Sequence, residues 1–457
     1  MARIALLTTN IAGRINATTE LSRRLARAGH EVVFLTAVEP GEAPPEVPGT
    51  FMPLPSSGSA SSQKKNRTGI GRAYAMLTRM SGIWRLSALR EERVDRLSPE
   101  AVIDIIQEIA PDLVLIDIEL PVEIMAGRAT GRPVALLNDM YSVWRRPGVP
   151  PLSSHIVPGV GWRGTPLWIT VSWWGFRGWK WLQRMRFRIT RVGLDRRSVL
   201  KAVADRTGFP LTDETSSGHW LIPFVYESIP TLTLNALEME FPHQPLPHVT
   251  YVGPQLAERD TGGPPPVVPL RGDPLADVLA RCNADPERKL IYCSFGAFGE
   301  SDSSILQRVI EAVGEQPHWE LVVGLGGRGQ AELLASAPPN VHIYEWAPQL
   351  EVLRRADCAV HHAGTHSVNE CVLAEVAMVL FPDDTLDHRG NAARVSFHGL
   401  GVVGDLRRDT PETIRQHIRR CLQSDEFRGN LVRMSASFRA YERTGAVEKV
   451  VEDLLVH

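Results

Sequence analysis

Two hydrophobic patterns alternate along most of the chain. Short apolar runs, typical of buried strands, are followed by stretches in which apolar residues recur every three or four positions, as in amphipathic helices. Residues 3–8 form the first run, and a helical stretch with Leu21, Leu25 and Ala28 on one face separates it from the run 31–36. This pattern predicts a strand–helix–strand unit, which is the building block of a parallel sheet.

The alternation continues through the first half and restarts after a segment rich in proline and glycine. Proline and glycine are too frequent between residues 241 and 275 for a helix or a central strand, so we place a linker at 246–275. The other predicted strands are 112–117, 133–137, 289–295, 320–324, 341–344, 357–361 and 377–381.

The chain is therefore expected to be an α/β protein with two parallel-sheet domains, at 1–245 and 276–430. A single core stops growing near about 250 to 300 residues, so a length of 457 residues also favours two domains. The last segment, 431–457, has a helical pattern, and we expect it to cross back to the first domain.

Charge and cysteine usage exclude several classes of protein. With 50 Lys+Arg against 52 Asp+Glu, the net charge of -2 gives no reason to expect a nucleic-acid partner. The five cysteines form no C-x-x-C pair, so a zinc site and a disulfide framework are disfavoured and a cytoplasmic location is expected. The start does not resemble a signal peptide, and no apolar stretch reaches the roughly 18 residues of a bilayer span. Residues 56–68 have the composition of a loop.

Residues 140–194 contain no acidic residue, yet they carry nine arginines or lysines and seven tryptophans. Tryptophan has a large apolar ring and a polar N–H group, so it favours boundaries between apolar and aqueous surroundings. Cationic side chains are attracted to anionic lipid headgroups. The segment is predicted to be interfacial, either resting on a membrane as a peripheral contact or closing over an apolar ligand. Packing of some of these tryptophans in the core is the alternative. RNA binding would use the same residue types, but no other feature supports it.

The strongest chemical signal follows the predicted strand 357–361. Parallel sheets bind ligands beyond the carboxyl ends of their strands, where helix N-termini attract anions. We expect Gly364 to permit a sharp turn, Ser367 to open a helix and His362 to face its first turn, so that a phosphate would meet all three. Alternatively, Ser367 and Glu370 form a helix capping box, which needs no ligand.

Three ordered motifs resemble the nucleotide-sugar signature of the UDP-glycosyltransferase superfamily. They are Trp346-Ala347-Pro348-Gln349, His362-Ala363-Gly364-x-x-Ser367-x-x-Glu370, and Pro382 with Asp387-His388-x-x-Asn391-Ala392-x-Arg394-Val395. The resemblance implies the GT-B fold, in which two Rossmann-like domains face each other across a cleft.

The resemblance also implies a role for each motif residue in binding the donor. By that comparison Trp346 stacks on the nucleobase, Gln349 borders it, His362 and Ser367 hold the diphosphate, Glu370 takes the ribose hydroxyls, Asp387 and His388 contact the sugar, and Ser294 and Gly364 complete the site. An indole suits a base, a carboxylate suits a diol, and donors at a helix start suit phosphate. The alternatives are a core tryptophan at 346 and a solvated acid at 387.

The chain departs from the family pattern at several positions. The usual Asn of the His-containing loop is His366, the usual Gln after the sugar-binding Asp is His388, and the usual Gly and Pro before the last strand are Glu375 and Ala377. The spacing from Pro382 to Asp387 is also one residue longer than is common, so the identity of the sugar stays open.

The largest departure concerns the family's catalytic His, which follows a Gly after the first strand. Here Arg14 follows Gly13, and arginine cannot be deprotonated to act as a general base. The family's partner acid corresponds to Asp117, with Glu119 two residues further on. Either carboxylate could take the acceptor proton, the acceptor could need little base help, or the protein could bind a nucleotide sugar without transferring it. Arg14 and Asp117 could also form a structural ion pair.

By resemblance, the sequence predicts an inverting glycosyltransferase that uses a UDP- or TDP-sugar. The tryptophan-rich segment 140–194 alone predicts that the acceptor is a lipophilic small molecule. We expect Trp144 and Glu119 to border the acceptor, and we expect no metal and no cofactor. A glycosyltransferase-like nucleotide-sugar-binding auxiliary protein and a GT-B epimerase are the alternatives. Asp383, Asp384 and Asp387 match the DDxxD motif of prenyl-transferring enzymes, but those are all-helical.

Overall fold

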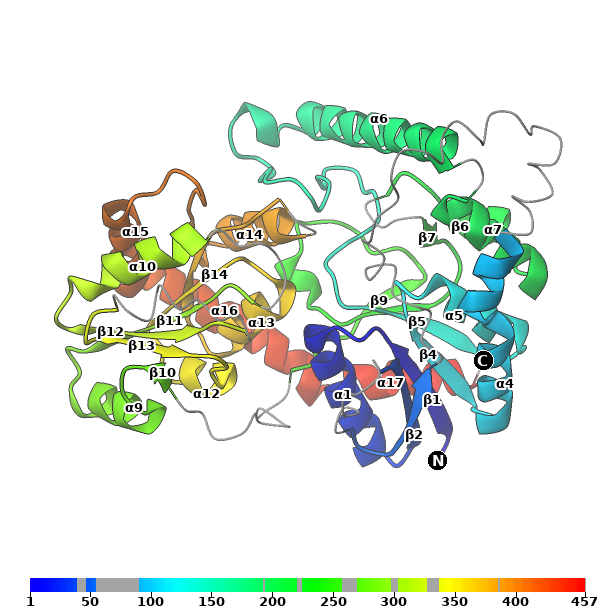
Figure 1. The fold of residues 1–457 in the computed structure, drawn as a ribbon, viewed down its shortest axis with the longest axis horizontal. Helices are drawn as coiled ribbons and strands as arrows, with labels where there is room; N and C mark the ends of the chain where they lie inside the picture. Colours follow the sequence, from blue (N-terminus) through cyan, green and yellow to red (C-terminus); the bar gives the residue numbers. More distant parts are fainter. Residues whose placement is uncertain are drawn as a thin grey trace, which may run out of the picture.

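The structure is a computed structural model of the chain. It describes residues 1–38, 47–54, 90–191, 194–219, 224–256, 269–296, 303–326, 337–384 and 387–456. The predicted loop 56–68 lies outside these ranges. The described residues form two seven-stranded sheets that lie side by side, each with helices packed around it (Figure 1). A third, two-stranded sheet pairs β6 (Thr215–Ser216) with β7 (Val225–Tyr226).

The first sheet is built from the first half of the chain in the order β3-β2-β1-β4-β5-β8-β9, and all of its pairings are parallel. Its strands are β1 (Arg3–Thr8), β2 (Glu31–Ala37), β3 (Thr50–Leu54), β4 (Leu113–Asp117), β5 (Val134–Asn138), β8 (Thr231–Thr233) and β9 (Val249–Tyr251). Buried central strands of this kind need apolar residues on both faces, and β4 and β5 are buried throughout.

The second sheet has the order β10-β13-β12-β11-β14-β15-β16 and is parallel except for its edge strand β10. Its strands are β10 (Pro269–Arg271), β11 (Lys289–Ser294), β12 (Trp319–Gly324), β13 (Val341–Tyr344), β14 (Cys358–His361), β15 (Ala377–Leu380) and β16 (Gly401–Val403). Every strand expected from the sequence is confirmed, with each end within one residue of its predicted position.

The range 246–275, predicted as a linker, contributes a short edge strand to each sheet. β9 lies at the edge of the first sheet and β10 at the edge of the second. Edge strands tolerate proline because one side of the strand makes no ladder bonds, and Pro269 begins β10.

Helices cover both sheets, and the chain ends by returning to the first one. The helices used below are α1 (Ala12–Arg27), α5 (Pro121–Ala129), α6 (Pro166–Arg191), α12 (Gln349–Leu353), α13 (Thr365–Leu373), α14 (His388–Phe397), α16 (Asp425–Arg443) and α17 (Ala446–Val456), with the short 3-10 helix η2 (Leu237–Met239). Val447 and Val451 of α17 are buried in one core with Leu21 and Leu25 of α1, so the last helix packs on the first sheet's helices (Figure 1).

Candidate nucleotide-sugar site

The candidate donor site lies at the carboxyl end of β14, where a short loop leads into α13. His362 occupies this loop, and its ring lies 4.4 Å from the ring of His388, measured between centroids. A Cβ at Gly296 or at Gly364 would come within 2.8 Å of the His362 ring. Both glycines therefore leave space for this imidazole.

Gly364 was expected to make the sharp turn of this loop, and that expectation is wrong. Gly364 has φ -61° and ψ 141°, which any residue can adopt, whereas the left-handed turn falls on Ala363 with φ 70°. The glycine is required by the close approach of His362 instead. Beneath the loop, burial and the neighbouring His362 and His388 lower the pKa of His361 to about 3, so this imidazole is neutral.

Helix α13 begins at Thr365, two residues earlier than predicted, and Gly364 is its N-cap. Because Ser367 lies inside the helix and caps nothing, the capping box with Glu370 is wrong. Val368 makes the first helical backbone bond, to the carbonyl of Gly364 at 3.0 Å, so the N–H groups of residues 365–367 lie outside the helical ladder. Together with the Ser367 hydroxyl, they form a set of donors suited to an anion.

Gln349, at the start of α12, connects the polar residues around this helix start. Its side-chain amide donates to Ser367 Oγ (3.3 Å) and to Glu370, and its carbonyl accepts from the hydroxyl of Tyr292 (3.0 Å). Trp346 lies just before α12 and is 49% exposed, so it is not a core tryptophan and offers its ring to a ligand. Ser294 ends the neighbouring strand β11 and is partly exposed.

Asp387 and His388 are buried at the start of α14. Asp387 accepts hydrogen bonds from Thr365 Oγ1 (2.6 Å) and Asn391 Nδ2 (2.9 Å), so it is not a solvated acid. His388 Nδ1 lies 2.6 Å from Asp383, and Asp384 pairs with Arg389. The three acids of the DDxxD match therefore contact different partners.

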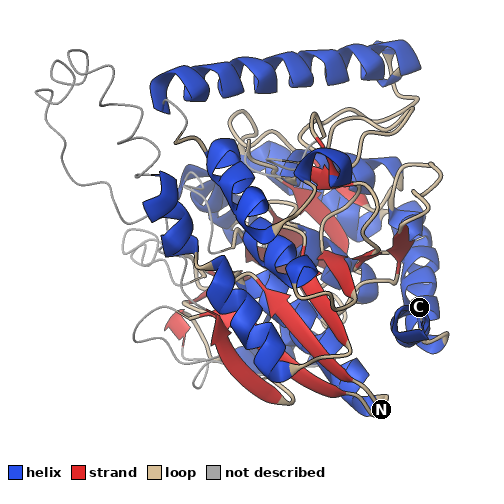
Figure 2. Cartoon of the chain, turned by 90° about the vertical axis from the view of Figure 1, so that its right-hand side faces the viewer, coloured by secondary structure: helices blue, strands red, loops and turns tan. Residues whose placement is uncertain are grey.

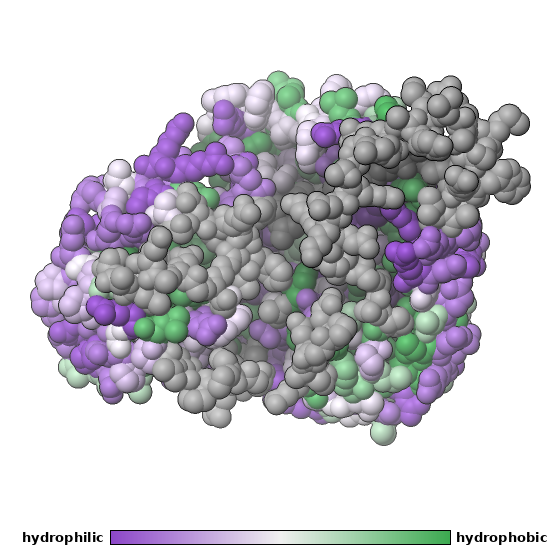
Figure 3. Space-filling model, viewed as in Figure 1, coloured by the Kyte–Doolittle hydropathy of each residue, from purple (hydrophilic) through white to green (hydrophobic). Residues whose placement is uncertain are grey.

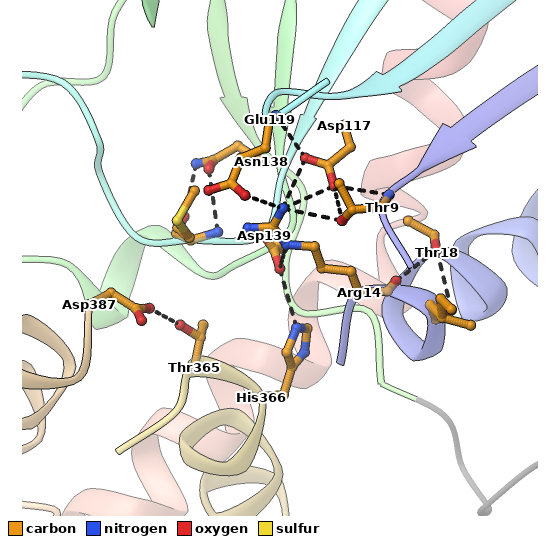
Figure 4. A network of polar contacts seen from close by, with 12 residues as sticks. Thr9, Arg14, Thr18, Asp117, Glu119, Asn138, Asp139, Thr365, His366 and Asp387 are labelled. Atoms are coloured by element: carbon orange, nitrogen blue, oxygen red, sulfur yellow. Dashed lines mark hydrogen bonds and ion pairs between the residues drawn. The ribbon is translucent and has the colours of Figure 1, made fainter. Parts of the chain in front are cut away.

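The opposite side of the site, on the first half of the chain, is organised by Arg14 (Figure 4). Its buried guanidinium lies 2.8 Å from Glu119, 3.1 Å from Asp117 and 3.1 Å from Asp139. Asp117 is the last residue of β4, Glu119 lies two residues further on, and Asp139 follows β5, so all three lie at the carboxyl edge of the first sheet. The predicted ion pair of Arg14 with Asp117 is present as part of a larger cluster.

Within this cluster Asp117 accepts hydrogen bonds from three protein donors. Its carboxylate accepts from Thr9 Oγ1 (2.7 Å), the Glu119 N–H (2.9 Å) and Arg14 Nη1 (3.1 Å). Burial acts to raise the pKa of Asp139, but Arg14 and His366 outweigh it and hold that pKa at about 2. Burial likewise opposes the charge of Arg14, but the three carboxylates raise its pKa well above the usual range.

Two residues of this region were not identified as functional from the sequence. Asp139 comes directly after β5, and its position at the carboxyl end of a parallel strand is the signal that could have found it. His366 was noted only as a departure from the family pattern. In the structure its Nε2 lies 3.4 Å from Asp139 Oδ2, so it contacts the first half of the chain from α13 (Figure 4).

The two residues predicted to border the acceptor differ in exposure. Trp144 is only 2% exposed and packs in the core at a T-shaped angle to His248, so its ring has little surface to offer an acceptor. The side chain of Glu119 is 30% exposed beside Arg14.

The cationic, tryptophan-rich segment 140–194 includes α6, which lies along the outer edge of the molecule in two perpendicular views (Figures 1 and 2). Trp144 and Trp173 pack in the interior, as the core-packing alternative expected. On α6 an apolar stripe is exposed at helical spacing, comprising Leu167, Val171, Trp174, Trp181, Leu182, Met185 and Ile189. Hydrophobic side chains are visible along this edge of the surface (Figure 3). Within the described residues no helix is both long and apolar enough to cross a bilayer.

The arrangement defines a class of protein: a GT-B α/β protein in which the helix after β14 begins with backbone N–H groups that lie outside the helical ladder. Residues 307–454 match the family described as "Erythromycin biosynthesis protein CIII-like, C-terminal domain". The oleandomycin glycosyltransferase of Streptomyces antibioticus is 28% identical over 166 residues, which are 36% of this chain and 38% of that protein. The uncharacterized UDP-glucosyltransferase YdhE of Bacillus subtilis (strain 168) is 26% identical over 169 residues, 37% of this chain and 42% of that protein. The matched segments thus span about two fifths of the length of these relatives.

Solved structures match over nearly the whole chain. The glycosyltransferase of kitacinnamycin has a TM-score of 0.64 at 19% identity, covering 99% of this chain and 98% of that one. Glycosyltransferase VinC, solved in complex with DTDP, has a TM-score of 0.60 at 17% identity, covering 99% of this chain and 100% of that one. The chain therefore has the GT-B fold, and its second half is similar in sequence to glycosyltransferases.

Proposed function

We propose that the protein is an inverting glycosyltransferase that moves a sugar from a UDP- or TDP-sugar to a lipophilic small molecule. The observation that carries the proposal is the donor set at the start of α13, where His362 and Ser367 adjoin three backbone N–H groups. The half-exposed Trp346 and the carboxylate of Glu370 extend this set for a base and a ribose. Relatives that transfer sugars in the biosynthesis of natural products support the same chemistry.

In this proposal the second half of the chain stabilises the leaving group. As the bond from the anomeric carbon to the diphosphate breaks, negative charge develops on a phosphate oxygen beside His362, Ser367 and the N-terminus of α13. Fixed donors aimed at that charge lower the barrier because they need no reorganisation during the reaction. The acceptor oxygen attacks from the side of the first sheet, opposite the diphosphate, so the configuration inverts. No metal and no cofactor are assigned to this reaction.

The proposal is tested by calorimetry with UDP and TDP, followed by a panel of their sugars with phenol and alcohol acceptors. Trp346→Ala is expected to weaken nucleotide binding by roughly 10-fold, because base stacking contributes about 1 to 3 kcal/mol. The variant Trp319→Phe, in a strand of the same sheet, serves as a control. Binding without any transfer would favour the auxiliary-protein alternative, and the absence of heat with both nucleotides would refute the donor site.

We also propose that α6 makes a peripheral contact with an anionic membrane. Its exposed apolar stripe is flanked by arginines, and the segment 140–194 carries no acid that would repel anionic headgroups. Flotation with vesicles of phosphatidylglycerol and phosphatidylcholine tests the contact. Trp174→Glu with Trp181→Glu should abolish flotation, whereas Lys201→Glu, at an exposed position of another helix, should not. If the double tryptophan variant and Lys201→Glu floated with the vesicles to the same extent, the proposal would be contradicted.

A further inference from the structure

His366 lies at the boundary between the two halves of the molecule. It is the second residue of α13, next to Ser367, and its side chain is 26% exposed. Its ring packs against the backbone of α1, where a Cβ added to Gly13 would lie 2.5 Å from His366 Cδ2. An imidazole therefore adjoins both the proposed diphosphate site and the helix that carries Arg14 (Figure 4).

Asp139 holds this imidazole in a defined orientation. Asp139 Oδ2 accepts from Arg14 Nε at 3.1 Å and lies 3.4 Å from His366 Nε2. A carboxylate beside Nε2 favours the tautomer in which Nε2 carries the proton. Nδ1 is then the lone-pair nitrogen, and no hydrogen bond to Nδ1 is found among the residues that the structure describes.

The cluster also explains how an arginine can occupy the position of the usual histidine. Arg14 cannot accept a proton, but it neutralises and fixes Asp139 while it binds Asp117 and Glu119 on its other side. Of the charged groups in the first half of the chain, Asp139 contacts His366 directly. Arg14, with Asp117 and Glu119, lies on the far side of Asp139.

We propose that His366, oriented by Asp139, is the general base of the transfer, so that the proton acceptor is supplied by the donor-binding half of the chain. This inference rests on the proposed function. The acceptor O–H proton moves to His366 Nδ1 as the acceptor oxygen bonds to the anomeric carbon. At the same time the bond from that carbon to the diphosphate breaks, and its electron pair leaves on the phosphate oxygen. Asp139 is a positioning residue in this scheme.

The test compares the wild-type protein with His366→Asn, which installs the family's usual residue, and with Asp139→Asn. Loss of a general base typically costs about 10² to 10⁴ in rate, so His366→Asn should lower kcat by that factor with an aliphatic alcohol acceptor. With a nitrophenol, which is already acidic, the loss should be much smaller. The Kd for UDP should change by less than about threefold in both variants, and His318→Asn, at an exposed and distant position, should behave like wild type.

Asp139→Asn should reduce kcat less than His366→Asn does, and its loss of kcat should also be larger with the aliphatic alcohol than with the nitrophenol, because Asp139 acts through the imidazole. A purely structural aspartate would lower kcat by the same factor with both acceptors.

The outcomes separate the inference from the function on which it rests. Transfer by wild type together with near-normal kcat for His366→Asn on the alcohol would overturn the role of His366 and leave the proposed function standing. If His366→Asn lost kcat by the same factor with the alcohol and with the nitrophenol, the role of His366 would also be overturned, because the acidic nitrophenol needs less help from a base. UDP binding without transfer by wild type would overturn both.

Discussion

At the scale of single residues, the first-sheet side of the site is held together by the ion pairs that the Arg14 guanidinium makes with three carboxylates. Arg14 contacts Asp117, Glu119 and Asp139 within 3.1 Å, and it is itself buried. A buried charge is tolerated only when it is paired and hydrogen-bonded, so the cluster is stable as a whole and sensitive to the loss of any member. Protonation of Asp139 is one such loss.

The folded protein should therefore lose stability in acid through Asp139. Its pKa of about 2 lies below the usual value of 3.8 for an aspartate, so the stabilisation is present above about pH 4 and is lost as the pH falls towards 2. The contribution at neutral pH is on the order of 2 kcal/mol. Urea unfolding at pH 7 and pH 3 should show a smaller pH dependence for Asp139→Asn than for wild type.

The exposed surface pair of Lys201 with Asp205 provides the control for this prediction. Both side chains are about two thirds exposed, so Asp205→Asn should alter the free energy of unfolding by less than about 1 kcal/mol at either pH. An unchanged pH dependence in Asp139→Asn would show that the cluster does not hold that carboxylate ionised.

At the scale of secondary-structure elements, the decisive feature is how β14 passes into α13. The strand ends at His361, Ala363 takes the left-handed conformation, and the helix starts at Thr365. This tight connection aims the helix N-terminus and the His362 ring into the same space. Because Gly364 has ordinary dihedrals, its lack of a side chain matters for packing rather than for backbone conformation.

Gly364→Ala should consequently impair ligand binding more than stability. The new Cβ would lie 2.8 Å from His362 Nε2, so the imidazole must move away from the start of α13. We expect the Kd for UDP to rise by about 10-fold, which corresponds to the loss of roughly one charge-assisted hydrogen bond. Calorimetry measures the affinity, and thermal unfolding should show a small change in Tm.

Gly175→Ala is a matched control, because a Cβ at this position of α6 meets no atom within 4 Å. It should leave the affinity for UDP unchanged and should stabilise its helix slightly, since alanine has the higher helix propensity. If Gly364→Ala bound UDP as well as wild type does, His362 would not contact the diphosphate.

At the scale of the whole molecule, buried polar contacts fix the two halves against each other. Arg394 of α14 donates to Glu240, which follows η2, and neither side chain is more than 1% exposed. Tyr141 donates to Asn369 at 3.1 Å, and Asn369 donates to Asn235 at 2.7 Å. The position of α13 relative to the Arg14 cluster is set by such contacts.

Removing one partner of the buried Arg394–Glu240 pair should destabilise the protein strongly. Arg394→Met leaves a buried carboxylate without its cation, which typically costs about 3 to 5 kcal/mol. Urea unfolding should show this loss, and the double variant with Glu240→Gln should recover part of it. Arg407→Met, at an exposed position, should leave the free energy of unfolding almost unchanged. If Arg394→Met and Arg407→Met changed the free energy of unfolding by similar amounts, the prediction would be contradicted.

The two-sheet fold and the position of the motif residues around the start of α13 could be predicted from the sequence because both depend on local patterns. The strands of a parallel sheet are continuous apolar runs, and β1 and β13 were predicted to the residue. Trp346, His362 and Ser367 lie in short ordered motifs whose spacing is visible in the chain. Their roles in donor binding stay predictions until a ligand is measured.

The contacts of Arg14, Asp139 and His366 could not be predicted in the same way, because they join residues far apart in sequence. Arg14, Asp139 and His366 come from α1, the end of β5 and the start of α13, and their charges meet only once both sheets have formed and packed together. Local patterning thus determined the strands, the helices and the donor motifs. Tertiary packing decided which carboxylates Arg14 binds and which imidazole faces them, since short-range electrostatic contacts depend on distances of a few ångströms that sequence spacing does not encode.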